Sequence, residues 1–249
     1  LFAADKSCSM GDDLANVQSN FAAYTSTLES LSADYRVAII VQDSGAVYGG
    51  DTYIDESNAD DAPDIAQEML SGSEGGYTEM AFTLLSNGVS QNSYWFRDDA
   101  KLNLVGVSDE PEQSAYSYSY YVSLFQDLKD DPDDVVVHAI GGDYPGGCES
   151  ASAYTGFYEA TVATDGTFLS ICTDDWDGLM RDLAAGMVDE DAALVLSQEP
   201  VEASIVVEID GQVHDQWSYS AESNAIALTN TPDNGETVTV RYTIPEDCE

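Results

Sequence analysis

The sequence predicts an α/β fold: a doubly wound, mostly parallel central sheet with helices on both faces, followed by a C-terminal antiparallel β-module. Three observations lead to this class. Short, continuously apolar runs at 36–41, 102–107 and 135–140 are typical of strands buried on both faces. Segments with helical spacing separate these runs, which favours a parallel sheet. Beyond residue 191, apolar and polar residues alternate instead.

The elements of the first part follow from local patterns. Apolar residues 1–4 indicate the end of a buried strand, and Leu14, Val17 and Phe21 begin an apolar series at helical spacing that predicts a helix over 14–31. After the strand at 36–41 we expect loops with an edge strand over 42–62, a helix over 65–70, a Gly/Ser-rich loop over 71–76 and a helix over 78–85. After the strand at 102–107 we expect a Tyr-rich helix over 116–128, the strand at 135–140, a Gly-rich loop over 141–147, a helix over 151–163, a strand over 168–171 and a helix over 176–187.

The C-terminal region, residues 191–249, has the two-residue period of half-buried strands and no helical period. Turn signals occur at Asp210-Gly211, Pro232 and Asn234-Gly235. The expected β-module is either a small appended domain or an extension that pairs with a partner's sheet.

Charge limits the partners that the chain can have. Its 249 residues include 47 Asp and Glu against 7 Lys and Arg, a net charge of −40. Such a surface repels phosphate backbones and anionic membrane surfaces, so we expect no nucleic-acid partner. No apolar run is long enough for a membrane span. Because salt weakens self-repulsion, the charge favours saline surroundings or abundant divalent cations, and the start at Leu1 suggests a processed or trimmed exported chain.

The four cysteines form no CxxC pair and no zinc spacing. Cys148 and Cys172 are expected to follow neighbouring strands at one sheet edge, where a disulfide is plausible in an exported protein. Cys8 and Cys248 could pair with each other, pair with another chain or stay free.

A candidate metal site begins directly after the first strand. Asp5-Lys6-Ser7-Cys8-Ser9 is an Asp-x-Ser-x-Ser run, in which alternate spacing lets a carboxylate and two hydroxyls converge from one turn. Hard oxygen ligands of this kind suit one Mg²⁺ ion, or Mn²⁺ or Ca²⁺.

Two further residues complete a recognisable pattern, since Thr78 follows the Gly-rich loop and Asp109 follows the strand at 102–107. With these, residues 1–188 resemble the von Willebrand factor A domain family and its metal-ion-dependent adhesion site. The carry-over assigns the site to five residues, Asp5, Ser7, Ser9, Thr78 and Asp109. In the family the hydroxyls contact the metal, the aspartates often act through water, and a Glu or Asp of the partner completes the coordination. The family's strand order would bring Asp5 and Asp109 to the same crevice, and residues 170–176 (SICTDDW) resemble bacterial surface or lipoprotein-like members.

Other polar features are assigned to surface or core. The acidic stretches at 55–61, 130–134 and 174–177 lack the EF-hand spacing and are expected to be solvated, while His138 is expected to be a satisfied core residue. No catalytic constellation is present, so the chain is not expected to be an enzyme. The Tyr-rich run at 116–121 suggests partner contacts through Tyr116, Tyr118 and Tyr120.

The function expected from these observations is metal-dependent binding of a protein or surface ligand outside the cytoplasm. The alternative is a structural subunit of a cell-surface assembly or filament, in which the metal is only structural and the C-terminal β-module mediates self-assembly.

Overall fold

Five parallel strands form the central sheet of the computed structural model, in the order β2-β1-β3-β4-β5. The strands are β1 (Phe2–Ala4), β2 (Ile39–Ile40), β3 (Leu102–Ser108), β4 (Val135–Gly141) and β5 (Phe168–Ser170). The structure describes residues 1–31, 33–73, 75–77, 79–188, 193–221, 224–228 and 237–244. The expected α/β class with a parallel sheet is confirmed, since every neighbouring pair in this sheet is parallel.

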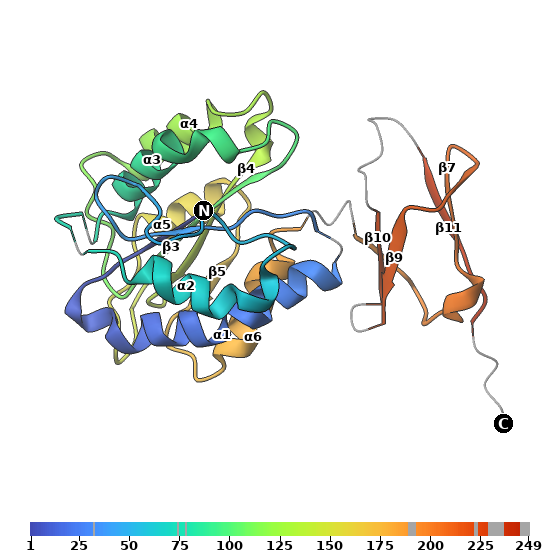
Figure 1. Ribbon diagram of the computed structural model, residues 1–249, viewed down its shortest axis with the longest axis horizontal. Coiled ribbons are helices and arrows are strands. Elements are labelled where there is room, and N and C mark those ends of the chain that lie inside the picture. Colours follow the sequence, from blue (N-terminus) through green and yellow to red (C-terminus); the bar gives the residue numbers. More distant parts are fainter. Residues whose placement is uncertain are drawn as a thin grey trace. The chain divides into compact units, whose positions relative to one another are not determined.

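Helices flank this sheet. They are α1 (Gly11–Ser30), α2 (Ala62–Leu70), α3 (Ala81–Asn92), α4 (Tyr118–Gln126), α5 (Phe157–Ala163) and α6 (Trp176–Ala185). In Figure 1, α3 and α4 lie on one side of the sheet, and α1 and α6 lie on the other. Among the described residues, no helix is long and apolar enough to cross a membrane.

Several predicted elements differ in the structure, and the edge strand expected within 42–62 is reduced to a single bridge at Ile54. Of the strand expected over 36–41, only β2 (Ile39–Ile40) pairs within the parallel sheet. Val37 forms an isolated antiparallel bridge with Ile54 instead. The helix expected over 78–85 begins later, at Ala81, and continues to Asn92.

The helix expected over 151–163 is confined to α5. The preceding segment is held in a non-helical conformation, because Ser152 N–H donates to the carbonyl of Asp109 (2.8 Å) and Tyr154 N–H to that of Gly142 (3.0 Å). Gly156 then starts α5 with a φ of +92°, a conformation that favours glycine.

Two glycines allow aromatic rings to pack directly on the strands. A Cβ at Gly106 would lie 2.3 Å from the Phe157 ring, and one at Gly141 would lie 2.2 Å from the Tyr154 ring. Phe157 also stacks on Phe82, with ring centroids 4.1 Å apart. Phe82, Tyr154 and Phe157 thus form an aromatic layer that packs on one face of the sheet.

His138, on β4, is fully buried and satisfied, as predicted. Its Nε2 lies 2.9 Å from Asn103 Oδ1, and its Nδ1 accepts the Thr167 N–H at 3.1 Å. Burial lowers the pKa of His138 to about 3, so the ring is neutral.

The chain divides into two units, Leu1–Ser26 with Tyr35–Met187, and Thr27–Asp34 with Val188–Glu249. In the second unit the described strands are β6 (Ala193–Val195), β7 (Val206–Ile209), β8 (Gln212–His214), β9 (Trp217–Ser220), β10 (Ala225–Leu228) and β11 (Val238–Arg241). They form two antiparallel sheets, β6-β10-β9 and β11-β7-β8, as expected of a β-rich region.

The second unit has a hydrophobic core of its own, centred on Val207 and Ile226, which are fully buried. The predicted turn at Asp210-Gly211 joins β7 to β8 with both residues at positive φ. The other predicted turns, Pro232 and Asn234-Gly235, lie outside the described residues.

Candidate functional site

The candidate site lies at the carboxyl ends of β1 and β3, which are neighbours in the sheet although about a hundred residues separate them in sequence. Phe2 pairs with Val105 and Ala4 with Val107, so Asp5 and Asp109 leave the sheet at the same edge. The strand order reverses at this pair of strands, since β2 lies on the other side of β1. Doubly wound folds bind ligands in the crevice at such a point.

Asp5 is fully buried and held on both carboxylate oxygens. Its Oδ1 accepts the Ser7 N–H at 2.7 Å, and its Oδ2 accepts the hydroxyl of Ser108, also at 2.7 Å. Burial raises the pKa of Asp5, and the charge of Asp109 raises it further, whereas the two hydrogen bonds act in the opposite direction. A cation close to this carboxylate would therefore be favourable.

The hydroxyls of Ser7 and Ser9 connect the turn that follows β1 to Asp109, which follows β3. Ser7 Oγ lies 2.9 Å from Ser9 Oγ, and Ser9 Oγ donates to Asp109 Oδ1 at 3.2 Å. Asp109 is only 5% exposed. The structure therefore brings together four of the five predicted site residues, Asp5, Ser7, Ser9 and Asp109.

Thr78, the fifth, lies outside the described residues. Its neighbours are tied to the same region from two directions. Asp43, after β2, accepts the N–H groups of Gly76 (2.8 Å) and Tyr77 (3.0 Å). On the other side, Gln113 N–H donates to the carbonyl of Glu79 at 2.9 Å, which links this loop to the one that follows Asp109.

Lys6 occupies a variable position of the motif and anchors the turn. Its Nζ donates to the carbonyl of Leu70 at 2.8 Å and to that of Gly72, both at the end of α2. One of the few cations of the chain thus holds the motif against α2 by way of backbone carbonyls.

Several residues of this region were not singled out from the sequence. Ser108 orients Asp5, and Asp13, in the first turn of α1, is half-buried near Asp109. Burial first, and then the charges of Asp109 and Asp12, raise the pKa of Asp13 to about 6. Only adjacency to a motif residue could have pointed to Ser108, and an acidic pair opening a helix is too common to have identified Asp13.

Two further polar residues, the half-buried Glu112 and the buried Tyr154, lie in the same region. Glu112 accepts N–H bonds from Ser114 (2.7 Å) and Phe82 (3.3 Å), and burial raises its pKa. The Tyr154 hydroxyl is buried without a hydrogen-bond partner among the described residues. Burial raises the pKa of Tyr154 well above its usual value, and the charges of Glu112 and Asp5 add to this effect.

The donor set fits a hard divalent cation. Neutral hydroxyls and two carboxylates are the oxygen ligands that Mg²⁺ and Ca²⁺ prefer, and they converge within hydrogen-bonding distance of one another. In the part of the chain that the structure describes, no group of three or more His, Cys, Asp or Glu side chains could hold a metal ion. A site here would therefore depend on serine hydroxyls.

The predicted disulfide between Cys148 and Cys172 is present, with Cα atoms 6.5 Å apart. It joins the segments that follow β4 and β5, at the sheet edge that carries Asp5 and Asp109. The Cys8 thiol is free and exposed, and Cys248 lies outside the described residues.

The Tyr-rich run divides between surface and core. Tyr116, Tyr118 and Tyr120 are exposed, whereas Tyr121 is buried and stacks on Phe82. The three predicted contact residues are thus accessible, and their role stays a prediction.

Comparisons with known proteins add little. No family model and no curated protein matches the chain. Among solved structures, proximal thread matrix protein 1 from the mussel byssus is similar over 74% of this chain and 44% of its own length, with 13% identity and a TM-score of 0.42. A likeness at this level carries no argument about fold or function.

Proposed function

We propose that the first unit is a von Willebrand factor A-type domain that binds a divalent cation and, through it, a carboxylate of a protein or surface ligand outside the cytoplasm. The observation that carries this proposal is the contact chain from Asp5 through Ser7 and Ser9 to Asp109, across the ends of two adjacent parallel strands. The strand order also supports it, because the resemblance implies that the strands before Asp5 and Asp109 are neighbours.

The residues have separate tasks in this proposal. The hydroxyls of Ser7, Ser9 and Thr78 would contact the cation, and Asp5 and Asp109 would act through water. When bound, the cation supplies an electrophilic position for a partner's carboxylate. Ser108 and the Ser7 N–H keep the Asp5 carboxylate in one orientation, which is the usual task of groups behind a metal ligand.

Two properties of the chain bear on where and how it binds. The Cys148–Cys172 disulfide supports an oxidising, extracellular location. A chain with a net charge of −40 repels an acidic ligand, so we expect association to strengthen from low to moderate salt. Affinity that falls steadily as salt rises would count against this expectation.

Calorimetric titration of metal-stripped protein with Mg²⁺, Mn²⁺ and Ca²⁺ in 1 M NaCl tests the metal site. We expect one saturable site that is absent from Asp5→Ala and retained in Asp60→Ala, an exposed carboxylate on the same unit. Weak, multiple binding that is equal in all three proteins would overturn the proposal.

A second candidate function is a structural subunit of a surface assembly. It is favoured by the second unit, whose two antiparallel sheets have a core of their own and end in edge strands such as β8. Edge strands offer unpaired backbone groups for pairing with another chain. Sedimentation velocity separates the candidates, because assembly that is indifferent to EDTA and to Asp5→Ala favours the structural subunit.

A further inference from the structure

Helix α4 carries an exposed apolar stripe along its outer face. Tyr120 and Leu124 lie four residues apart on α4 and are 48% and 37% exposed. Tyr116, just before the N-cap, and Leu128, just after the C-cap, extend the stripe and are 61% and 49% exposed. Residues at this spacing share one side of a helix, and the opposite side of α4 is buried through Tyr121, Val122 and Phe125. The stripe is therefore not needed for the core of the unit.

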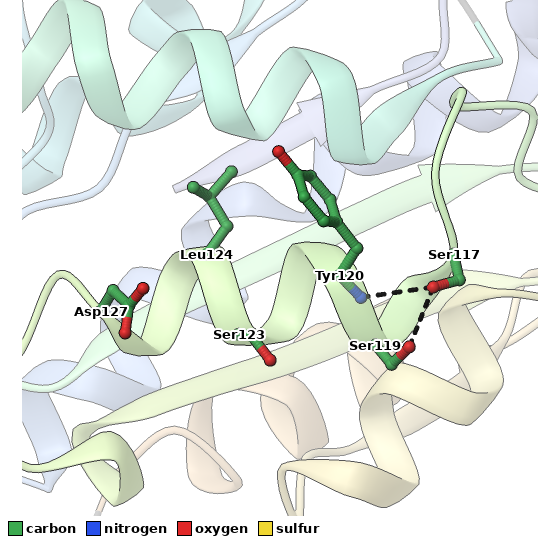
Figure 2. Close-up of a pocket in the computed structure, with 6 residues that line it drawn as sticks. All are labelled: Ser117, Ser119, Tyr120, Ser123, Leu124 and Asp127. Atoms are coloured by element: carbon green, nitrogen blue, oxygen red, sulfur yellow. Dashed lines mark hydrogen bonds between the residues drawn. The ribbon is translucent and has the colours of Figure 1, made fainter.

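A groove accompanies the stripe. Figure 2 shows the residues that line a cavity of about 400 Å³, with Tyr120 and Leu124 projecting from one side of α4 and Ser119 and Ser123 from the other. Ser117 and Asp127 complete the lining. All of these residues belong to α4 or its caps, so the groove is a shallow hollow on the outer face of one helix, with an apolar side, a hydroxyl-bearing side and one carboxylate.

The groove is preorganised at the start of α4. Ser117 caps the helix by accepting the Tyr120 N–H, and its hydroxyl lies 2.9 Å from that of Ser119. The Tyr116 and Tyr120 rings pack together with centroids 4.4 Å apart. Aromatic side chains that are already held in place make good binding anchors, because little conformational entropy is lost on binding.

The acidic residues near the α4 groove favour a positively charged partner. Asp127 lines the groove, and three more exposed carboxylates, Asp130, Asp131 and Asp133, follow it in sequence, with Lys129 as the one basic residue of this segment. Lys129 Nζ donates to the carbonyls of Arg97 and Ala100, each at 2.5 Å, so its charge is directed to the backbone of the neighbouring loop. A docked segment is therefore favoured if it carries Lys or Arg beside its apolar side chains, and guanidinium groups can also stack on exposed tyrosine rings.

We propose that the α4 stripe and its groove dock a cationic amphipathic peptide segment, with apolar anchors against Tyr120 and Leu124 and Lys or Arg side chains toward the acidic border. This surface is separate from the serine hydroxyls of the metal site and requires no cation. It therefore stands or fails independently of the proposed adhesion site.

Fluorescence anisotropy with labelled peptides tests the proposal on the full chain, in 0.5 M NaCl with EDTA. The probes are an 18-residue Leu/Lys peptide with helical periodicity and a scrambled peptide of the same composition. We expect the periodic peptide to bind at least about tenfold tighter than the scrambled one, because only the former presents its apolar anchors on one side.

Two variants and a control locate the binding. Tyr120→Ser and Leu124→Ser should each weaken binding by roughly tenfold, as expected for central anchors. Tyr94→Ser, which alters a tyrosine that is 73% exposed elsewhere on the unit, should leave it unchanged. All three positions are exposed, and equal melting temperatures would confirm intact folds. Equal affinity for both peptides, equal effects of the three substitutions, or loss of binding in EDTA would each overturn the proposal.

Discussion

Replacing Asp5 by Asn should invert the order of stability between the metal-free and metal-loaded protein. The Asn side chain keeps an oxygen for the Ser7 N–H and places an amide toward the Ser108 hydroxyl, which can accept a hydrogen bond. The substitution thus removes the charge of a fully buried carboxylate without removing its packing. Without metal, we expect Asp5→Asn to be at least as stable as the wild type, because burial disfavours the charged form.

With bound metal, we expect the wild type to be more stable than Asp5→Asn. At a Mg²⁺ concentration 100 times the dissociation constant, a site specific to the folded state stabilises the wild type by about 2.7 kcal/mol. For a unit of this size this corresponds to a rise in Tm of roughly 5 to 10 °C. The variant should gain only the diffuse effect that Mg²⁺ has on any acidic chain.

The difference in stability between Asp5→Asn and the metal-free wild type should depend on pH. Because burial raises the folded-state pKa of Asp5 above the ordinary value of 3.8, its stabilising contribution is complete below that value and is lost as pH rises through the folded pKa. The advantage of Asn in EDTA should therefore grow with pH and vanish at low pH.

Thermal unfolding followed by circular dichroism, in 1 M NaCl with EDTA or MgCl₂, measures these differences, with Asp60→Asn as the control. An equal gain in Tm for Asp5→Asn and the wild type on adding Mg²⁺ would refute the reasoning. So would a large loss of stability of Asp5→Asn in EDTA.

Four further measurements test other parts of the structure. Replacing Cys148 and Cys172 by Ser opens a disulfide with a sequence separation of 24 and should cost about 3.5 kcal/mol in unfolding free energy by loop-closure entropy; denaturant titration would show a change under 1 kcal/mol if the bond does not form. Tyr154→Phe removes a buried hydroxyl that has no partner among the described residues and should be neutral or stabilising by about 1 kcal/mol, whereas clear destabilisation would reveal a bridging water. Because the folded-state pKa of Asp13 is raised to about 6, metal-free protein should lose stability as pH rises from about 4 to 7, and Asp13→Asn should show a flatter profile; parallel profiles would contradict this cause. Finally, since the net charge is −40, the melting temperature should rise clearly more between 0.1 and 1 M NaCl than in sorbitol of equal osmolality, because only salt screens the charges, and equal rises would assign the effect to water activity.

Strands that consist of a continuous apolar run could be predicted from the sequence. The runs that became β3 and β4 admit few alternatives, because a strand covered on both faces must be apolar at successive positions. The segment at 151–156 could not be predicted, because its composition suits a helix. Its backbone instead bonds to Asp109 and Gly142, partners that are distant in sequence and invisible to a local pattern.

The Tyr-rich run shows a related limit. Consecutive tyrosines cannot all face the core, so the sequence indicated that some are exposed. Which ones are buried depends on where α3 and α5 pack, and Tyr121 is the residue that meets Phe82. The resulting stripe from Tyr116 to Leu128 became evident only when that packing was known.

Part of the candidate site could likewise be predicted from the sequence, and part depends on tertiary structure. The sequence by itself determined that Asp5, Ser7 and Ser9 converge, because their alternate spacing in one turn is a local property of the backbone. Only the tertiary structure decided that Asp109 completes the group and that Ser108 orients Asp5, at separations of 100 and 103 residues. Local spacing sets which side chains of one turn can meet, whereas the order of strands in a sheet is set by packing of the whole chain, and β1 lies beside β3 for that reason.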